Sequence, residues 1–203
     1  AAAVTGLTAN SGKKVEEGVG IDTTGLETAV FAGGCFWCIE SDMESVPGVR
    51  EAVSGYTGGQ LPNPTYNQVS SGSTGHVEAV KVYYDPAEIS YERPLDAYWS
   101  QFDPTDGTGS FVDRGEQYRP VIFYRDDAQR IAAEKSRDAL GASGRFSRKL
   151  ATEILPLNEF YVAEDYHQDY YSKNPLRYKY YRFNSGRDQF LAKTWGEDLQ
   201  MKT

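Results

Sequence analysis

The chain contains two cysteines, and they stand three residues apart. Cys35 and Cys38 follow Gly33-Gly34, a pair that lets the backbone turn sharply. Residues 28–31 predict a short strand, and residues 36–45 contain no helix breaker and predict a helix. Cys35 is therefore expected in the first turn of that helix, where free N–H groups and the positive end of the helix dipole favour a thiolate. Since the thiolate is the reactive form of cysteine, the sequence predicts a nucleophile here.

This Cys-x-x-Cys pair is compatible with three kinds of site. One is a redox pair, because residues i and i+3 in a helical turn have Cα atoms ~5–6 Å apart, which a disulfide can bridge. A zinc site would need two more ligands, and the two histidines, His76 and His167, lack the local spacing of a zinc motif, so both are expected to be structural and no metal is expected. Two buried structural thiols are the third kind, which the preceding glycines and the intervening Trp37 disfavour. The pair indicates redox chemistry as a class and leaves the reaction open.

The clearest strand covers residues 76–84. Its side chains alternate, so Glu78 points in the same direction as Val80 and Val82. If that face is buried, the carboxyl leaves water and its pKa rises. A carboxylic acid that stays protonated near neutral pH is a proton donor. Taken alone, a glutamate at an exposed strand position is the commoner case.

The other predicted elements interleave without the regular rhythm of a doubly wound sheet. Further strands are predicted over 49–55, 120–124 and 149–155, and further helices over 91–102, 126–140 and 162–172. Long Gly-, Pro- and Asp-rich loops separate them, and the residues after 172 are aromatic and basic with little periodicity. We predict an α+β fold, a two-layer α/β sandwich around a mixed sheet with a ferredoxin-like core, with long loops and an irregular C-terminal segment.

The composition is that of a folded globular protein. The chain has 203 residues, of which 15 are Tyr, 9 Phe and 3 Trp, and so many aromatic residues argue against disorder. A net charge of -8 without a basic stripe argues against a nucleic-acid partner. No apolar run approaches the ~20 residues that span a membrane, so no membrane span is expected.

Residues 1–25 are polar and show no periodicity, which predicts an arm over the domain surface. Residues 26–203 are then expected to form a single catalytic domain. Nothing in the sequence predicts an oligomer, so a monomer is expected. The compartment stays open: cytoplasmic, or periplasmic or exported if the Ala1-Ala2-Ala3 start reflects signal removal.

Several segments resemble one known family. Gly34-Cys35-Phe36-Trp37 is similar to the signature of the peptide methionine sulfoxide reductase A family. Segments that match the same family follow in order: Gly55-Tyr56-x-Gly58-Gly59, Asn63-Pro64-Thr65-Tyr66, Gly72-x-Thr74-Gly75-His76-x-Glu78, Tyr84-Asp85-Pro86, Asp103-Pro104-Thr105, Asp113-x-Gly115-x-Gln117-Tyr118-Arg119 and Tyr166-His167-Gln168. So many ordered matches make chance agreement negligible.

The resemblance implies a reaction and its catalytic residues. The family reduces the S-epimer of methionine sulfoxide, free or in proteins, and so repairs oxidative damage. It implies that Cys35 attacks the sulfoxide sulfur and is left as a sulfenic acid, while Glu78 protonates the oxygen. Tyr66 and Tyr118 are implied to donate hydrogen bonds to that oxygen. The chemistry is consistent, because a sulfoxide sulfur is electrophilic only when its oxygen is protonated or strongly hydrogen-bonded.

The resemblance also implies how substrate is held. Phe36 and Trp37 form an apolar pocket for the substrate methyl group, and Asp113 contacts the substrate main chain. An aromatic pocket suits an S-methyl group, and it allows stereochemical choice because methyl and oxygen need different walls. Each of these residues, taken alone, would be interpreted as a core or turn residue. Their roles follow from their positions in the ordered segments that match the family, together with Cys35.

The second cysteine departs from the common family pattern. Many relatives have Gly where Cys38 stands and carry resolving cysteines near the C-terminus, where this chain has Ser185; the loop position Val112 is not cysteine either. We therefore expect Cys38 to attack the sulfenic acid and form a Cys35–Cys38 disulfide. A thioredoxin-like dithiol protein would reduce it, and no bound cofactor is expected.

Two competing hypotheses remain. A general dithiol–disulfide oxidoreductase shares the cysteine pair but would not need Glu78, Tyr66 or Tyr118, and no thioredoxin-like order of strands and helices surrounds the pair. A zinc-stabilised interaction domain would carry bound metal after purification.

Overall fold

A computed structural model describes residues 20–199 of the chain, so most of the predicted arm, 1–25, lies outside the described residues. Ile21, near the end of that arm, and Leu26, just after it, pack against Val53 and Tyr83 of the sheet. The elements follow in this order: β1 (Glu27–Ala32), α1 (Phe36–Glu44), β2 (Val49–Thr57), α2 (Tyr66–Ser70), β3 (Val77–Tyr84), α3 (Glu92–Trp99), β4 (Gly109–Ser110), β5 (Asp113–Arg114), η1 (Glu116–Tyr118), β6 (Val121–Tyr124), α4 (Asp127–Ala142), β7 (Glu153–Pro156), β8 (Phe160–Val162), α5 (Tyr170–Lys173), α6 (Pro175–Asn184), α7 (Arg187–Trp195) and η2 (Gly196–Leu199).

Six strands form one mixed sheet in the order β7-β6-β1-β3-β2-β8. Neighbouring strands are antiparallel except β6 and β7, which are parallel. Helix α1 connects β1 to β2, and α3 lies between β3 and β6, so the four central strands have the β-α-β-β-α-β connectivity of a ferredoxin-like core. The predicted α+β fold is confirmed.

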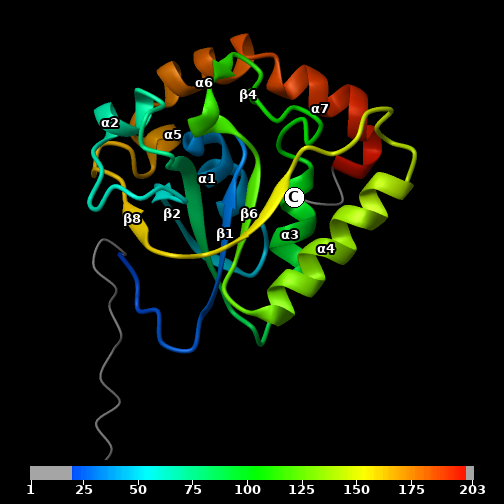
Figure 1. Ribbon diagram of the computed structural model, residues 1–203, viewed down its shortest axis with the longest axis horizontal. Coiled ribbons are helices and arrows are strands. Elements are labelled where there is room, and N and C mark those ends of the chain that lie inside the picture. Colours follow the sequence, from blue (N-terminus) through cyan, green and yellow to red (C-terminus); the bar gives the residue numbers. More distant parts are fainter. Residues whose placement is uncertain (1–19, 200–203) are drawn as a thin grey trace, which may run out of the picture.

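The two faces of the sheet have separate cores. In β1, Ala29 and Phe31 join the core under the helices, while Val30 and Ala32 join the core on the other face, as strand alternation requires. Helices α1, α3 and α4 cover the first face (Figure 1). The connection from β7 to β8, which crosses the sheet in Figure 1, covers the second face with Leu157, and Phe160 at the start of β8 packs beside it.

Two predictions around β8 were wrong. Strand β2 does not end at Gly55 but continues to Thr57, because β8 pairs with these last residues. A Cβ at Gly55 would lie 2.4 Å from Phe160 Cζ, so glycine permits this close pairing. The helix predicted over 162–172 is instead the end of β8, a turn with Asp169 in the left-handed region (φ 52°), and the short α5.

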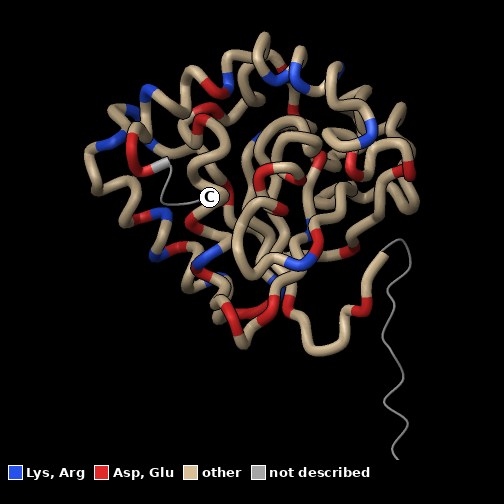
Figure 2. Tube along the Cα trace, turned by 180° about the vertical axis from the view of Figure 1, so that it is seen from behind, with Lys and Arg blue, Asp and Glu red and all other residues tan. Residues whose placement is uncertain are grey.

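The C-terminal segment, predicted to be irregular, forms helices. Pro175 occupies the first turn of α6, where its missing N–H costs nothing, and Gly186 (φ 79°) separates α6 from α7. Together α5, α6 and α7 form an arc along one side of the molecule (Figure 1), and Lys and Arg recur along it (Figure 2). Among residues 20–199, no helix is long and apolar enough to cross a membrane.

Candidate active site

The sharp turn after β1 places the cysteines at the start of α1. Cys35 is the N-cap residue, with non-helical dihedrals of φ -57° and ψ 122°, and the Cys38 N–H donates to the Cys35 carbonyl at 3.1 Å. Both cysteines are reduced and buried. Gly34 has a φ of 95°, and a Cβ there would lie 2.5 Å from Ser110 Cβ. The predicted handover from strand to helix at Cys35 is confirmed.

Gly34→Ala is expected to lower the unfolding free energy by more than the cost of a positive φ alone. A left-handed alanine costs ~1–2 kcal/mol, and the clash with Ser110 adds to it, so we expect a total loss of about 3 kcal/mol or more in unfolding free energy. Gly144 is the matched control, because its φ is 74° but nothing lies within 4 Å of its Cβ position. Denaturant unfolding of both variants checks this; equal losses would refute the close packing at Gly34.

Glu78 lies on the helix-facing side of β3 and is 3% exposed, so the predicted buried face is confirmed. The Phe36 N–H, in the first turn of α1, donates to Glu78 Oε2 at 3.1 Å. Burial raises the pKa of this carboxyl to about 8, against the opposing effect of the Phe36 hydrogen bond. At neutral pH Glu78 is therefore a protonated carboxylic acid, and it is held by a hydrogen bond to Phe36, the residue that follows Cys35.

The two thiols differ in acidity, and not in the expected direction. Burial raises the pKa of Cys35 well above its usual value, and the hydrogen bond with Cys38 and the nearby Glu78 and Asp113 charges raise it further. The expected preference for a Cys35 thiolate at the helix end was therefore wrong, because burial outweighs the helix end. The hydrogen bond from Cys35 lowers the pKa of Cys38 to about 7, so Cys38 is the more acidic thiol.

A buried arginine contributes to that acidity. The Arg187 side chain is fully buried, and its Nη1 donates to the Gln101 carbonyl. Its Nη2 lies 3.1 Å from the position of a Cβ at Gly34, so the guanidinium sits beside the cysteine turn. The positive charges of Arg187 and Arg182 both lower the pKa of Cys38.

Two phenols and one more carboxyl complete the polar part of the site. Tyr66 comes from α2, Tyr118 from η1 and Asp113 from β5. Burial, then the charge of Glu78, raises the pKa of Tyr66 to about 12 and that of Tyr118 still higher, so both remain proton donors. Burial raises the pKa of Asp113, which accepts a hydrogen bond from the Tyr181 hydroxyl. The charge of Cys35 also raises the pKa of Tyr66 and of Tyr118, and the charge of Asp113 raises the pKa of Cys35, so these predicted residues lie near Cys35.

The predicted apolar wall lies in a cluster of rings. Phe36 is buried and Trp37 half-buried, and the Trp37 ring stacks on Tyr170 with centroids 3.7 Å apart. Trp37 Nε1 donates to His167 Nδ1 at 3.1 Å, and the His167 ring lies 5.0 Å from Phe36 and 4.5 Å from Tyr66. Burial lowers the pKa of His167, so it is a neutral acceptor.

Sequence reasoning missed three supporting residues. His167, expected to be only structural, orients Trp37 within the ring cluster. Glu164 accepts from the Tyr66 backbone N–H at 2.9 Å and from Tyr56 Oη at 2.7 Å, and so holds the start of α2. Tyr181 binds Asp113. The signal available was the Tyr166-His167-Gln168 match. His76, in contrast, hydrogen-bonds with the loop backbone at Gly59 and Leu61 and packs against Tyr161, as predicted for a structural histidine.

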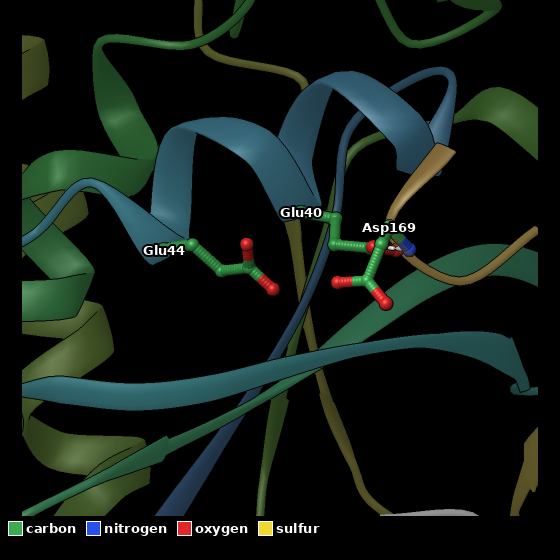
Figure 3. Close-up of side chains that lie close together, drawn as sticks. All are labelled: Glu40, Glu44 and Asp169. Carbon is green, nitrogen blue, oxygen red and sulfur yellow. Dashed lines mark hydrogen bonds between the residues drawn. The ribbon is translucent and has the colours of Figure 1, made fainter. Parts of the chain in front are cut away.

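A second group of carboxylates lies farther along α1. Glu40, Glu44 and Asp169 point toward one another (Figure 3). Glu40 is fully buried and accepts from Ser54 Oγ and the Asp169 N–H, while Glu44 accepts from the Tyr171 hydroxyl. Burial raises the pKa of Glu40 to about 8 and that of Glu44 to about 7. These bonds tie α1 to β2 and to the start of α5.

The buried carboxyls predict a stability that falls as pH rises. Glu40 has a pKa of about 8 when folded and 4.5 as its ordinary value, so the folded state holds the proton more tightly and loses this advantage as pH approaches 8. We expect the melting temperature to fall by about 5 °C between pH 5 and pH 8. Glu40→Gln removes one titrating group and should flatten that dependence in calorimetry; an unchanged slope would show that Glu40 ionises normally.

The site combines two thiols of unequal acidity, Cys35 and Cys38, with the protonated Glu78 beside the cysteine turn. On an α+β fold, this combination is that of a thiol-based oxidoreductase. Residues 27–199 match the model of the family described as peptide methionine sulfoxide reductase. The chain therefore belongs to the peptide methionine sulfoxide reductase family, and the resemblance seen in the sequence is confirmed together with the reduction of methionine sulfoxide.

Individual relatives agree with this assignment. The chain is 54% identical over 170 residues to the peptide methionine sulfoxide reductase MsrA of Listeria innocua, which covers 84% of this chain and 96% of that protein. It is 53% identical over 180 residues to the MsrA/MsrB protein of Vibrio cholerae, covering 88% of this chain but only 48% of that longer protein. Reduced Mxr1 from Saccharomyces cerevisiae superimposes with a TM-score of 0.73 at 29% identity, covering 79% of this chain and 92% of that one.

Proposed function

We propose that Cys35 reduces the S-epimer of methionine sulfoxide with Glu78 as the acid. The Cys35 sulfur attacks the sulfoxide sulfur while the Glu78 proton goes to the oxygen, and the thiol proton of Cys35 returns the Glu78 carboxylate to its acid form. The S–O bond of the sulfoxide breaks as methionine leaves, and the oxygen ends on Cys35 as a sulfenic acid. The observation that carries this proposal is the buried Glu78, with a pKa of about 8, bound to the Phe36 N–H beside the cysteine turn. General acid catalysis requires such a group, still protonated at neutral pH, at the reacting atoms.

The surrounding residues support roles for the rest of the site. Tyr66 and Tyr118, both kept protonated, donate to the sulfoxide oxygen and so make its sulfur more electrophilic. Phe36 and Trp37 receive the methyl group. Asp113, held by Tyr181, binds a main-chain N–H of the substrate. We propose that residues 26–203 work as a single catalytic domain and monomer.

The cycle closes through the second thiol. The Cys38 sulfur attacks the Cys35 sulfenic sulfur, which gives a Cys35–Cys38 disulfide, and the thiol proton of Cys38 goes to the leaving hydroxyl, which departs as water. A thioredoxin-like dithiol protein then reduces this disulfide by thiol–disulfide exchange, so the enzyme itself needs no bound cofactor. The lowered pKa of Cys38 supports its role as the attacking thiol. Mxr1, which has a similar fold, has been solved in complex with Trx2.

Activity on the two separated sulfoxide epimers, with a thioredoxin system as reductant, tests reaction, stereochemistry and recycling together. Turnover of the S-epimer alone is the expected result, and turnover of the R-epimer would refute the stereochemical assignment. The alternative, a general dithiol–disulfide oxidoreductase, predicts reduction of insulin disulfides instead. The buried cysteine pair and the acid beside it favour the sulfoxide reaction.

A further inference from the structure

Helix α6 presents an apolar stripe to solvent. Leu176, Tyr180 and Phe183 occupy positions i, i+4 and i+7 of the helix and are exposed to 84%, 75% and 67%. Helices of globular proteins usually turn such a stripe toward a core. Here the helix packs by its other side, where Tyr178 is buried. Contiguous exposed apolar surface of this kind marks a binding site more often than a chance arrangement.

The stripe borders a groove that reaches the active site. The groove has a volume of about 480 Å³ and is lined by Trp37, Tyr170, Leu176, Arg177, Tyr180 and Tyr181. Trp37 belongs to both places, because it follows Phe36 in the cysteine turn and stacks on Tyr170 at the groove. Tyr181 also belongs to both, since its hydroxyl binds Asp113. A chain whose oxidised methionine lies at Cys35 would therefore continue into this groove.

The segment that forms α5 and α6 is basic in an acidic protein. Between residues 170 and 184 there are no acidic residues, but there are four basic ones: Lys173, Arg177, Lys179 and Arg182. Lys173 and Arg182 form ion pairs with carboxylates of neighbouring segments. Among residues 20–199, Arg177 and Lys179 have no ion-pair partner, and Arg177 lines the groove. Since the whole chain has a net charge of -8, the unpaired Arg177 and Lys179 are a local positive charge that complements a negative partner.

We propose that the surface formed by Trp37, Leu176, Arg177 and Tyr180 binds the polypeptide segment that carries the methionine sulfoxide, with an acidic side chain of that segment beside Arg177. This inference rests on the proposed function, in which Trp37 walls the substrate pocket, and it specifies the substrate class. An extended segment fills the groove on one side of the oxidised residue, whereas a free amino acid ends at the pocket. The enzyme is thus built for sulfoxides in accessible, acidic stretches of protein.

The test compares three substrates in steady-state kinetics: N-acetyl-methionine sulfoxide amide, a short peptide with Glu residues flanking the sulfoxide, and the same peptide with Lys residues. Wild type should favour the Glu peptide over the Lys peptide by ~5-fold in kcat/KM. Arg177→Glu should reverse that preference. The double variant Leu176→Ser/Tyr180→Ser should lose ~10-fold on both peptides and keep its rate on the small substrate.

Ile131→Ser is the matched control, because Ile131 is an apolar residue of α4 that is 56% exposed and lies outside the groove. It should leave all three rates unchanged. Equal rates of wild type and the double variant on the peptides would overturn the proposal, as would equal losses on all three substrates. A raised KM for thioredoxin with unchanged peptide kinetics would also overturn it, since the stripe would then bind the reductant.

Direct binding separates this proposal from the proposed reaction. Fluorescence anisotropy of a labelled Glu-flanked sulfoxide peptide with the Cys35→Ser protein needs no turnover. About tenfold weaker binding by the Leu176→Ser/Tyr180→Ser variant in that background supports the surface even if the catalytic roles fail. Unchanged binding overturns it even if the enzyme reduces methionine sulfoxide as proposed.

Discussion

Glu78→Gln will lose nearly all of the first reductive step while it keeps its fold and its cysteines. Glutamine has the same shape, and its carbonyl oxygen can accept the Phe36 N–H that Glu78 Oε2 accepts at 3.1 Å. It has no acidic proton to give to the sulfoxide oxygen. General acids typically contribute ~10²–10⁴-fold to a rate, so we expect methionine formation in a single turnover to slow by ~100-fold or more.

The pH dependence provides the sharper readout. Because the pKa of Glu78 is raised to about 8, its acid form is present at neutral pH and disappears as pH rises above that value. The wild-type rate of methionine formation should therefore lose its acid contribution above about pH 8, and Glu78→Gln should show no such loss. Rapid quench followed by quantification of methionine measures both.

Glu40→Gln is the control for this experiment. Glu40 is also buried in the core, and its pKa is also raised to about 8, but its hydrogen bonds go to Ser54 and Asp169 rather than to the cysteine turn. It should reduce methionine sulfoxide within ~2-fold of wild type at 25 °C, since it lies outside the site. A Glu78→Gln rate equal to that of Glu40→Gln would end the proton-donor role.

The central strands and α1 could be predicted because their signals are local. Alternation along residues 76–84 placed Glu78 on the same face as Val80 and Val82, and the breaker-free run after Gly34 located the helix. The family match then identified Tyr66, Tyr118 and Asp113, which come from three separate elements and have no local pattern. Periodicity alone could not have predicted that these residues share one site, because the loops of the fold bring them together.

The predictions that were wrong concern features that depend on contacts between residues distant in sequence. Residues 160–162 have no marked strand pattern, and they form β8 because the edge of β2 is available beside them. Gln168 binds both the N–H and the carbonyl of Ser54, and no helix pattern at 162–172 reveals that contact. The acidity of Cys35 was predicted from the helix end alone, whereas burial by the completed fold decides it.

Helix α6 was missed for a related reason. A helix is recognised from sequence by apolar residues confined to one face, but in α6 aromatic residues lie on both sides: Tyr180 and Phe183 face solvent while Tyr178 is buried. The aromatic and basic composition that obscured the helix is the same composition that makes its outer face a binding surface. The departure from the usual pattern is thus informative about function.

The second large effect is expected for Cys38→Ser, which should separate reduction of the substrate from recycling of the enzyme. Serine fits the fully buried Cys38 position and keeps a hydroxyl for the hydrogen bond with Cys35. The variant should still form one equivalent of methionine in the absence of reductant, because that step uses Cys35. No disulfide can follow, so turnover with thioredoxin should fall by ~100-fold or more.

Mass spectrometry follows both products in one sample. Wild type should lose two hydrogens as the Cys35–Cys38 disulfide forms, while Cys38→Ser should gain one oxygen or, with dimedone present, one dimedone adduct at Cys35. Dithiothreitol reduces a sulfenic acid directly, so turnover with it should persist and show that the variant is folded. The geometry allows the disulfide, because residues i and i+3 at a helix start lie within bridging distance, and Cys35 already has non-helical dihedrals. Normal thioredoxin-dependent turnover of Cys38→Ser would assign the resolving step to the reductant itself.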